Sequence, residues 1–240
     1  METKQLTLSW SRVYEINELS KAFAQDLKNK GGLYLWVEGK SNPRVSYIGE
    51  AENFENRFKE HFKNIIHGLY TAVPENNDDL LDSYYKLLKN EECKYYHPKS
   101  IVFSENFERE IEREIKKIKE GIDLKIKHLR NTRFLFAKIA ENQADKRKEI
   151  EAIFMQKMHK KYFEIIDKKH PAELKDLHWK KNKQTDSGFS RSNTNFWGTI
   201  SKNPDKNCSY EIINNFSSVE EKIKEELEEI YGETIWWPSK

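Results

Sequence analysis

Cysteine is scarce in this chain, which has two cysteines, Cys93 and Cys208, among 240 residues. They lie far apart, and the first residues show neither the basic start nor the apolar stretch of a signal peptide, so reduced thiols are expected rather than a disulfide. Cys93 and His97 have the separation of two zinc ligands, but no second pair accompanies them. Long apolar runs are also absent, since none approaches the roughly 18 residues that span a bilayer. A cytoplasmic protein without a membrane partner is expected.

Charge of one sign is not in excess, because 42 Lys and Arg stand against 40 Asp and Glu, and the formal net charge is +2. This balance neither demands nor excludes a polyanionic partner. Lysine dominates locally from Lys157 to Lys183, and glutamate dominates from Ser218 to Lys240. The simplest interpretation of both runs is a solvated helix face. A glycine-rich phosphate loop, a dinucleotide fingerprint and a Gly-x-Ser-x-Gly elbow are all absent.

Aromatic and apolar residues are plentiful enough for a folded core. The chain is 37% hydrophobic and contains six Trp, eleven Tyr and thirteen Phe. Its length suits one large domain, or a small core that carries insertions and a tail. Wholesale disorder is therefore not expected.

Two β-rich stretches and a helix follow one another in the first third of the chain. Residues 33–38 and 45–48 favour strands, and the residues between them supply turn chemistry, so a β-hairpin is predicted. Asn53 can cap the helix that follows. The apolar residues of this helix recur at helical spacing: Phe54, Phe58, Phe62 and Ile65.

Further elements are predicted on both sides of this unit. Asn17 can cap a helix that the pair Gly31-Gly32 ends. Residues 106–120 have the pattern of an amphipathic helix, residues 133–140 that of a buried strand, and residues 145–163 that of a second helix.

The C-terminal segment contains a loop-rich region and one more helix. Residues 180–218 are rich in Asn, Ser, Lys and Gly, which favours loops. Ser218 and Glu221 have the spacing of a capping box, and Gly232 can end the helix that they begin.

One carboxylate stands out on the helix predicted for residues 145–163. Glu151 precedes Phe154, Met155 and Met158 by three, four and seven residues, so it projects on the apolar side of the helix. An ionised carboxylate is costly to bury unless a cation, an arginine or a metal ion neutralises it. The alternative is a glutamate at the rim, with its stem along the apolar edge and its head in water.

Four other residues form a pattern with the hairpin and the helix after it. Arg57 and His61 are four residues apart, so they share one helix face beside the phenylalanine stripe. Tyr34 and Tyr47 fall on adjacent strands and on the same face of the pleat. Taken singly, each has a simple structural explanation. Arg57 and His61 can be ordinary polar residues at the edge of the buried helix face, and Tyr34 and Tyr47 can be packing residues of the sheet.

Taken together, these residues resemble the GIY-YIG nucleases. The stretch Gly32-Leu33-Tyr34 is followed by Tyr47-Ile48-Gly49, then by Arg57 and His61 on a helix, and then by Glu151 on a helix behind a strand. The resemblance implies an α+β fold with a small three-stranded antiparallel sheet flanked by helices. Residues 33–38, 45–48 and 133–140 are then its strands.

The resemblance also implies a role for each matching residue. Tyr34 matches the tyrosine that is the first choice of general base toward the attacking water. Tyr47 matches the tyrosine that supports it or replaces it. Arg57 matches the arginine that contacts the scissile phosphate, and His61 matches the polar residue that assists the nucleophile. Glu151 matches the metal-binding glutamate.

The chemistry of phosphodiester hydrolysis suits these assignments. Negative charge develops on the phosphate oxygens, so a divalent cation and a guanidinium can stabilise the transition state. A cation bound by one carboxylate, with water and phosphate completing its shell, is expected to be Mg²⁺, with Mn²⁺ as a substitute. A free tyrosine titrates near 10, so Tyr34 needs the metal or Arg57 to lower its pKa.

The chain departs from the family pattern in three places. Leu33 replaces isoleucine in the first tripeptide, which is a mild change. A long insertion precedes Glu151, so Glu149 stays open as the alternative metal ligand. The asparagine that braces such sites is assigned to Asn195, with Asn193 as the alternative.

The expected organisation combines a core with additions. The core comprises residues 31–66 and 131–166, preceded by an arm and helix over residues 1–30. A mostly helical insertion covers residues 67–130, and an extension with a loop region and terminal helix covers residues 167–240.

These additions, and the lack of a zinc finger or other fused DNA-binding module, look more like the stand-alone restriction endonucleases of the family. Double-stranded DNA is the expected partner, and double-strand cleavage favours a homodimer or sequential nicking. Two alternatives stay open: a structure-selective or RNA-cutting nuclease with the same core, and a catalytically silent nucleic-acid-binding or protein-binding module.

Overall fold

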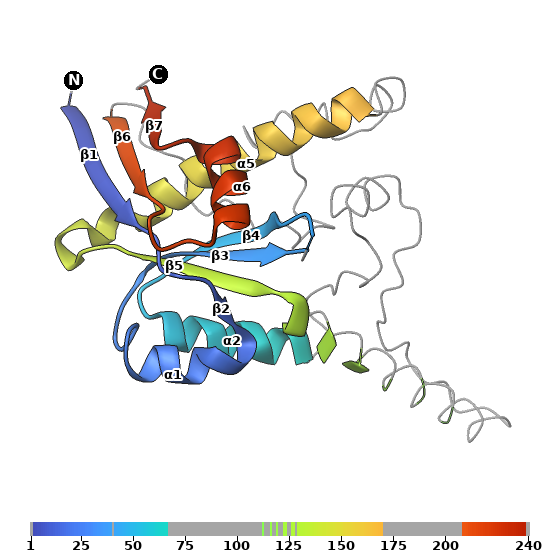
Figure 1. The fold of residues 1–240 in the computed structure, drawn as a ribbon. Coiled ribbons are helices and arrows are strands. Elements are labelled where there is room, and N and C mark those ends of the chain that lie inside the picture. Colours follow the sequence, from blue (N-terminus) through green and yellow to red (C-terminus); the bar gives the residue numbers. More distant parts are fainter. Residues whose placement is uncertain are drawn as a thin grey trace, which may run out of the picture.

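The structure is a computed structural model of the 240-residue chain. It describes residues 2–39, 41–66, 129–169 and 208–238, together with single positions between residues 112 and 127. Figure 1 shows how the described elements are arranged: a central sheet has helices on both faces, and a second, smaller sheet lies beside it.

The central sheet contains the predicted hairpin and has the strand order β2-β5-β3-β4. Strands β3 (Gly32–Glu38) and β4 (Arg44–Ala51) pair antiparallel, and β5 (Arg133–Lys138) pairs antiparallel with the other side of β3. The two-residue strand β2 (Tyr14–Glu15) extends the sheet beyond β5. The expectation of three strands is thus corrected to four, because the chain before the first helix adds a short edge strand.

Two helices cover one face of this sheet, α1 (Leu19–Ala24) and α2 (Phe54–Ile66). The Asn53 side chain accepts a hydrogen bond from the backbone N–H of Asn56 at 3.0 Å, so the predicted cap of α2 is present. The phenylalanines of α2 fill the space between helix and sheet, where Phe58 packs against Phe134 with ring centroids 5.3 Å apart. This aromatic layer fixes the position of α2 on the sheet.

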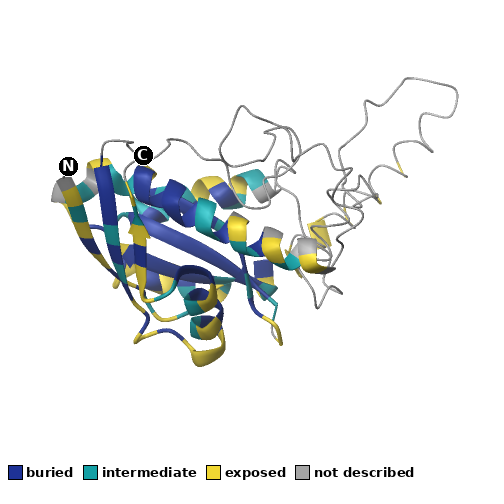
Figure 2. Cartoon of the chain, turned by 90° about the horizontal axis from the view of Figure 1, so that it is seen from above, coloured by how far each residue is buried: buried dark blue, intermediate teal, exposed yellow. Residues whose placement is uncertain are grey.

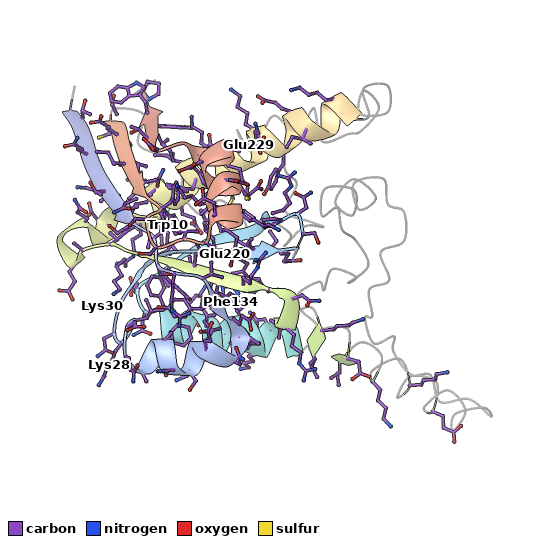
Figure 3. All side chains as sticks on the ribbon, in the orientation of Figure 1. Trp10, Lys28, Lys30, Phe134, Glu220 and Glu229 are labelled. Carbon is purple, nitrogen blue, oxygen red and sulfur yellow. The ribbon has the colours of Figure 1, made fainter. Side chains whose placement is uncertain are left out.

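The opposite face of the central sheet is covered by α5 (Arg147–Lys169) and α6 (Glu221–Tyr231), and the short helix η2 (Glu141–Lys146) leads into α5. Figure 2 shows buried residues along the strands and on the helix sides that face them. Figure 3 marks the two faces by Phe134 on the α2 side and by Trp10 on the other, where Trp10 packs against Phe154 with ring centroids 5.8 Å apart.

A second sheet, which the sequence analysis missed, unites the two ends of the chain. Strand β1 (Glu2–Ser9) pairs parallel with β6 (Cys208–Asn215), and β7 (Thr234–Trp237) pairs antiparallel with β6. Its inner face shares one apolar core with α5, α6 and the central sheet. Cys208 is buried in this sheet, whereas Cys93 lies outside the described residues, so the expectation of reduced thiols stays a prediction.

Two predicted helix starts are wrong. Asn17 does not cap the first helix, because a one-turn helix (η1, Ile16–Glu18) begins earlier with a capping box between Glu15 and Glu18. Ser218 does not cap α6, which begins at Glu221 without a side-chain cap. The end of α6 agrees with the prediction, since Gly232 follows it with φ +68°, a value that glycine adopts without strain.

Several predictions lie outside the described residues. They are the strand and helix content of most of the 67–130 insertion, the loops of residues 180–207, and both candidate asparagines, Asn193 and Asn195. Within the described part of the chain, no helix combines the length and the apolar character that crossing a membrane requires.

Candidate active site

The hairpin places two tyrosines side by side on the α2 face of the central sheet. Tyr34 lies opposite Gly49 in the β3–β4 ladder, and Tyr47 lies opposite Trp36. The rings of Tyr34 and Tyr47 are stacked, with centroids 6.0 Å apart and planes inclined by 23°. Strand alternation therefore brings the two tyrosines together, as the sequence pattern indicated.

Helix α2 places its two polar residues against the first of these tyrosines. His61 Nε2 lies 2.6 Å from Tyr34 Oη, and Arg57 Nε donates to the same oxygen at 3.3 Å. Because Arg57 occupies one acceptor site of the oxygen, the hydroxyl proton is best donated to Nε2 of a neutral His61. The four-residue spacing of Arg57 and His61 thus lets both reach one phenol.

The burial of this cluster is uneven. Tyr34 and His61 have no exposed surface, whereas Tyr47 is half-buried and the Arg57 side chain is 38% exposed. Arg57 and Tyr47 are therefore the groups that a ligand from solvent can contact, while Tyr34 and His61 lie behind them. We name these four residues the tyrosine cluster.

Burial controls the protonation of Tyr34 and His61. It raises the pKa of Tyr34 well above its usual value of 10, and Tyr47 adds to the rise while Arg57 opposes it. Burial also lowers the pKa of His61 to about 3, and the positive charge of Arg57 contributes to this decrease. At neutral pH, Tyr34 is a phenol and His61 is an uncharged acceptor.

The outer arginine keeps its charge. Burial lowers the pKa of Arg57, but Tyr34, Glu60 and Tyr47 together outweigh burial and the net change is upward. Glu60 Oε2 accepts a hydrogen bond from Arg57 at 2.8 Å. Sequence reasoning missed Glu60, although its place three residues after Arg57 on the same helix was a usable signal.

Trp36 is a second residue that sequence reasoning missed. Its ring centroid lies 5.1 Å from that of His61 and 5.1 Å from that of Tyr47. The indole thus helps to close the site on the sheet side and to keep His61 away from water. Its place two residues after Tyr34 on one strand puts it on the same face, which was the available signal.

Gly49 allows the two tyrosines to approach the backbone of β4. A Cβ atom at this position would lie 2.3 Å from Tyr34 Oη and 2.9 Å from Tyr47 Cε1. Such distances are far below van der Waals contact, so only glycine fits beside the Tyr34 hydroxyl. This explains physically why the second tripeptide ends in glycine.

Gly49→Ala is expected to destabilise the protein by about 1–3 kcal/mol, because the new methyl group must displace the buried Tyr34 ring. Denaturant unfolding measures the change. The double variant Gly49→Ala/Tyr34→Phe should recover part of the loss, since it removes the oxygen that the methyl group meets first. Equal stability of Gly49→Ala and the wild type would contradict this description of the site.

The predicted metal ligand comes from the other side of the sheet. Glu151 lies on α5 and is 6% exposed, so the interpretation as a solvated rim glutamate is wrong. One turn earlier, Arg147 approaches Glu50, the residue after Gly49, with Nε 3.4 Å from Oε2. The first turns of α5 therefore lie beside the strand end that contains Gly49.

The alternative ligand, Glu149, is engaged elsewhere. It is buried, and its Oε2 accepts a hydrogen bond from the hydroxyl of Tyr210 on β6. This contact ties Glu149 to the second sheet. Across the described part of the chain, no group of three or more His, Cys, Asp or Glu side chains could hold a metal ion.

Residues 30–120 match the family model of the GIY-YIG catalytic domain. No curated protein and no solved structure matches the chain. The match includes all four residues of the tyrosine cluster and ends before Glu151, whose assignment rests on its burial and on its helix behind the third strand of the sheet.

The match and the tyrosine cluster agree on the class of protein. The family match supports the GIY-YIG nuclease superfamily, and a mixed α/β fold with β3 and β4 carrying the two tripeptides is consistent with it. The matched domain indicates a nuclease-type fold.

Proposed function

We propose that the protein is a metal-dependent DNA endonuclease that hydrolyses phosphodiester bonds, with double-stranded DNA as substrate and the role of a restriction enzyme. The observation that carries the proposal is the Tyr34 hydroxyl, which lies 2.6 Å from His61 Nε2 and 3.3 Å from Arg57 Nε inside the matched domain. A phenol with an acceptor on one side and a guanidinium on the other can transfer a proton beside a bound phosphate.

The partial exposure of Arg57 supports a role in binding the phosphate. A guanidinium is suited to phosphate oxygens, and Arg57 can leave Glu60 to make that contact. The positive charge of Arg57 is the second cause of the low pKa of His61. A bound phosphodiester offsets this charge and makes His61 a better base, so substrate binding itself prepares the site.

The inner residues then supply the acid–base chemistry. When Arg57 turns to the phosphate it leaves the Tyr34 hydroxyl, and the attacking water takes its place there. The water then gives its proton to Tyr34 Oη as the Tyr34 proton passes to His61 Nε2. Tyr47, half-buried and stacked on Tyr34, holds the water and the ring in place or acts as the base itself. A general base contributes roughly 10²–10⁴-fold to such a reaction.

Glu151 would hold the metal ion. A carboxylate that is 6% exposed offers the oxygen ligand that a small divalent cation prefers, so the residue present fits Mg²⁺, and Mn²⁺ as a substitute. The ion would stabilise negative charge on the phosphate oxygens. Because a single carboxylate is assigned, the other ligands of the ion would come from water and phosphate.

Substrate class separates this proposal from its alternatives. A structure-selective or RNA-cutting nuclease would use the same residues on flaps, branched DNA or RNA. A catalytically silent binding module would retain the fold without cleavage. Defined duplexes, flaps and RNA of equal length, tested in parallel, distinguish the first alternative, and single-turnover cleavage distinguishes the second.

The experiment that tests the proposal is digestion of a supercoiled plasmid by the purified full-length chain. Mg²⁺ should support cutting into discrete fragments, and EDTA should stop it. Nicked circles alone, or a smear, would exclude a restriction enzyme. Discrete fragments from one site would also support a homodimer, because one active site cuts one strand.

Glu60→Gln is expected to tighten DNA binding by about two- to fivefold. In the wild type, Arg57 has to give up its ion pair with Glu60 before it can bind a phosphate, and the substitution removes that competing ion pair. Fluorescence anisotropy measures the dissociation constant for DNA, in a catalytically inactive form of the protein. Glu55→Gln is the matched control: it removes the same charge from α2, but Glu55 pairs with Lys59 at 2.7 Å. Equal effects of the two substitutions would show that only net charge matters.

A further inference from the structure

The three residues that precede Tyr47 on β4 are each held by a specific partner. The Arg44 guanidinium donates to Glu226 Oε2 on α6. The Val45 backbone N–H donates to Tyr162 Oη on α5 at 2.7 Å. Ser46 Oγ donates to the Trp36 carbonyl oxygen at 3.3 Å. The path of the chain into Tyr47 is therefore set from outside the hairpin as well as within it.

Glu226 connects these contacts into one buried network. Its side chain is 4% exposed, and its Oε1 accepts a hydrogen bond from Tyr162 Oη at 2.6 Å. Tyr162 thus donates to Glu226 and accepts from Val45, while Arg44 binds the other oxygen of the same carboxylate. The network joins α6, α5 and the first two residues of β4.

The hairpin needs such support at this point because its ladder is irregular. Trp36 pairs with Tyr47 and Val37 pairs with Val45, so Ser46 is an extra residue in β4 and forms a bulge. A bulge bends a strand and redirects the side chains beside it. Since β4 is an edge strand of its sheet, α5 and α6 supply the contacts that a further strand would provide.

A second contact holds the turn of the same hairpin to the start of α6. Arg133 on β5 donates to the carbonyl oxygen of Gly39, the residue after β3. The same guanidinium lies 3.6 Å from Glu220, directly before α6. In Figure 3 Glu220 lies at the end of α6 nearest the central sheet. The α6 segment is therefore connected to the hairpin twice, directly through Glu226 and Arg44 and indirectly through Glu220 and Arg133.

We infer that Glu226 is a positioning residue of the nuclease: through Arg44 and Tyr162 it holds the start of β4 so that Tyr47 stays stacked on Tyr34. The inference rests on the proposed function for its effect on cleavage. It extends the catalytic apparatus to α6, which lies beyond the residues that match the catalytic domain.

A purely stabilising role is the simpler alternative, and the energetics argue against it. Bringing charged groups into a protein interior costs free energy that the ion pair regains only partly. A well-packed apolar pair would hold α6 on β4 at least as firmly. The network adds hydrogen bonds of defined geometry. The two oxygens of the Glu226 carboxylate and the Tyr162 hydroxyl fix the positions of Arg44 and Val45 along β4.

The test compares Glu226→Gln and Tyr162→Phe with the wild type in the full-length chain. Glu226→Gln keeps the size of the side chain but loses its charge toward Arg44, and Tyr162→Phe removes the acceptor of the Val45 N–H. Glu229→Gln is the control, since Glu229 lies on the same helix, is 51% exposed and pairs with Lys161 at 3.0 Å. The two measurements are hydrogen exchange of the amides in residues 44–51 and the single-turnover cleavage rate at saturating DNA.

We expect exchange at Val45 to accelerate by at least about tenfold in Tyr162→Phe, because its protecting bond is lost. Cleavage should slow by at least about tenfold in both variants, since small displacements of reacting groups are costly. DNA affinity should change less than about twofold, because Arg57 is untouched. Glu229→Gln should match the wild type in all three measurements.

Two results would overturn the inference. One is unchanged exchange in residues 44–51 of both variants; the other is wild-type cleavage by a folded variant whose Val45 exchange has accelerated. If Glu226→Gln does not fold, Tyr162→Phe alone decides. If the wild-type protein cuts no nucleic acid, the proposed function is refuted instead. The exchange measurement then still tests whether Glu226 and Tyr162 fix the start of β4.

Discussion

Tyr34→Phe is expected to slow phosphodiester cleavage by about a thousandfold, the middle of the range for loss of a general base. The hydroxyl of Tyr34 is the only group removed, and it is the atom that His61 Nε2 and Arg57 Nε both contact. Phenylalanine keeps the ring stacked on Tyr47 and leaves Arg57 free for phosphate. The rate should fall while DNA affinity stays within about twofold.

The matched control for this substitution is Tyr14→Phe. Tyr14 is another buried tyrosine of the same apolar cluster, and its hydroxyl donates to Asp26 Oδ2 at 3.2 Å, away from the tyrosine cluster. It should cleave at the wild-type rate. Cleavage by Tyr34→Phe within about tenfold of the wild type would exclude Tyr34 as the base and leave Tyr47 as the candidate.

Acid is expected to destabilise the fold through His61. The unfolded chain protonates this residue below its ordinary pKa of 6.5, whereas the folded protein resists protonation until about pH 3. The unfolded state therefore binds more protons in this window, and the free energy of unfolding falls as the pH decreases. The contribution is fully present above pH 6.5 and is lost toward pH 3, on the order of 5 kcal/mol in total.

His61→Phe isolates this contribution, because phenylalanine fits among the aromatic rings of Trp36, Tyr47 and Phe58 and carries no titratable group. Chemical unfolding at several pH values gives the slope for each protein, and the difference between them reports His61 alone. The wild type should lose stability more steeply between pH 6.5 and 4. Parallel slopes would mean that His61 titrates normally in the folded protein.

The hairpin that carries Tyr34 and Tyr47 could be predicted from the sequence because several local signals agreed there. Residues 33–38 and 45–48 have strand composition with turn residues between them, and Asn53 caps the helix that delivers Arg57 and His61. Side-chain alternation in strands and four-residue spacing in helices then bring the tyrosine cluster together. Each of these rules acts over fewer than about ten residues, which is why sequence alone could apply them.

The second sheet could not be predicted because its pairing is not local. In β1 the buried residues Leu6 and Leu8 alternate with exposed ones, which is a strand signal. Its partner β6 begins at Cys208, so the two strands lie at opposite ends of the chain. Rules based on neighbouring residues cannot predict which distant strand will pair with β1. Parallel strands also need a long connection, so no short turn motif between them indicates the pairing.

The buried polar contacts escaped prediction for a related reason. Glu226 lies on an acidic stretch whose simplest interpretation was a solvated helix face, yet it binds Arg44 and Tyr162 inside the protein. Only the packing of α6 against β4 distinguishes it from exposed neighbours such as Glu229. The same holds for Glu149, a buried glutamate of α5 that accepts a hydrogen bond from Tyr210 inside the protein.

DNA cleavage by this protein is proposed to need the tyrosine cluster, Glu151 and a divalent metal together. The most direct test of this proposal is a single-turnover digestion of plasmid DNA by the wild type, Tyr34→Phe and Glu151→Ala, with Mg²⁺ or EDTA, at equal DNA occupancy. Over the time in which the wild type with Mg²⁺ completes one turnover, neither variant should cleave detectably, although both still bind the plasmid. Cleavage by Glu151→Ala at the wild-type rate, or by the wild type in EDTA, would contradict the proposal.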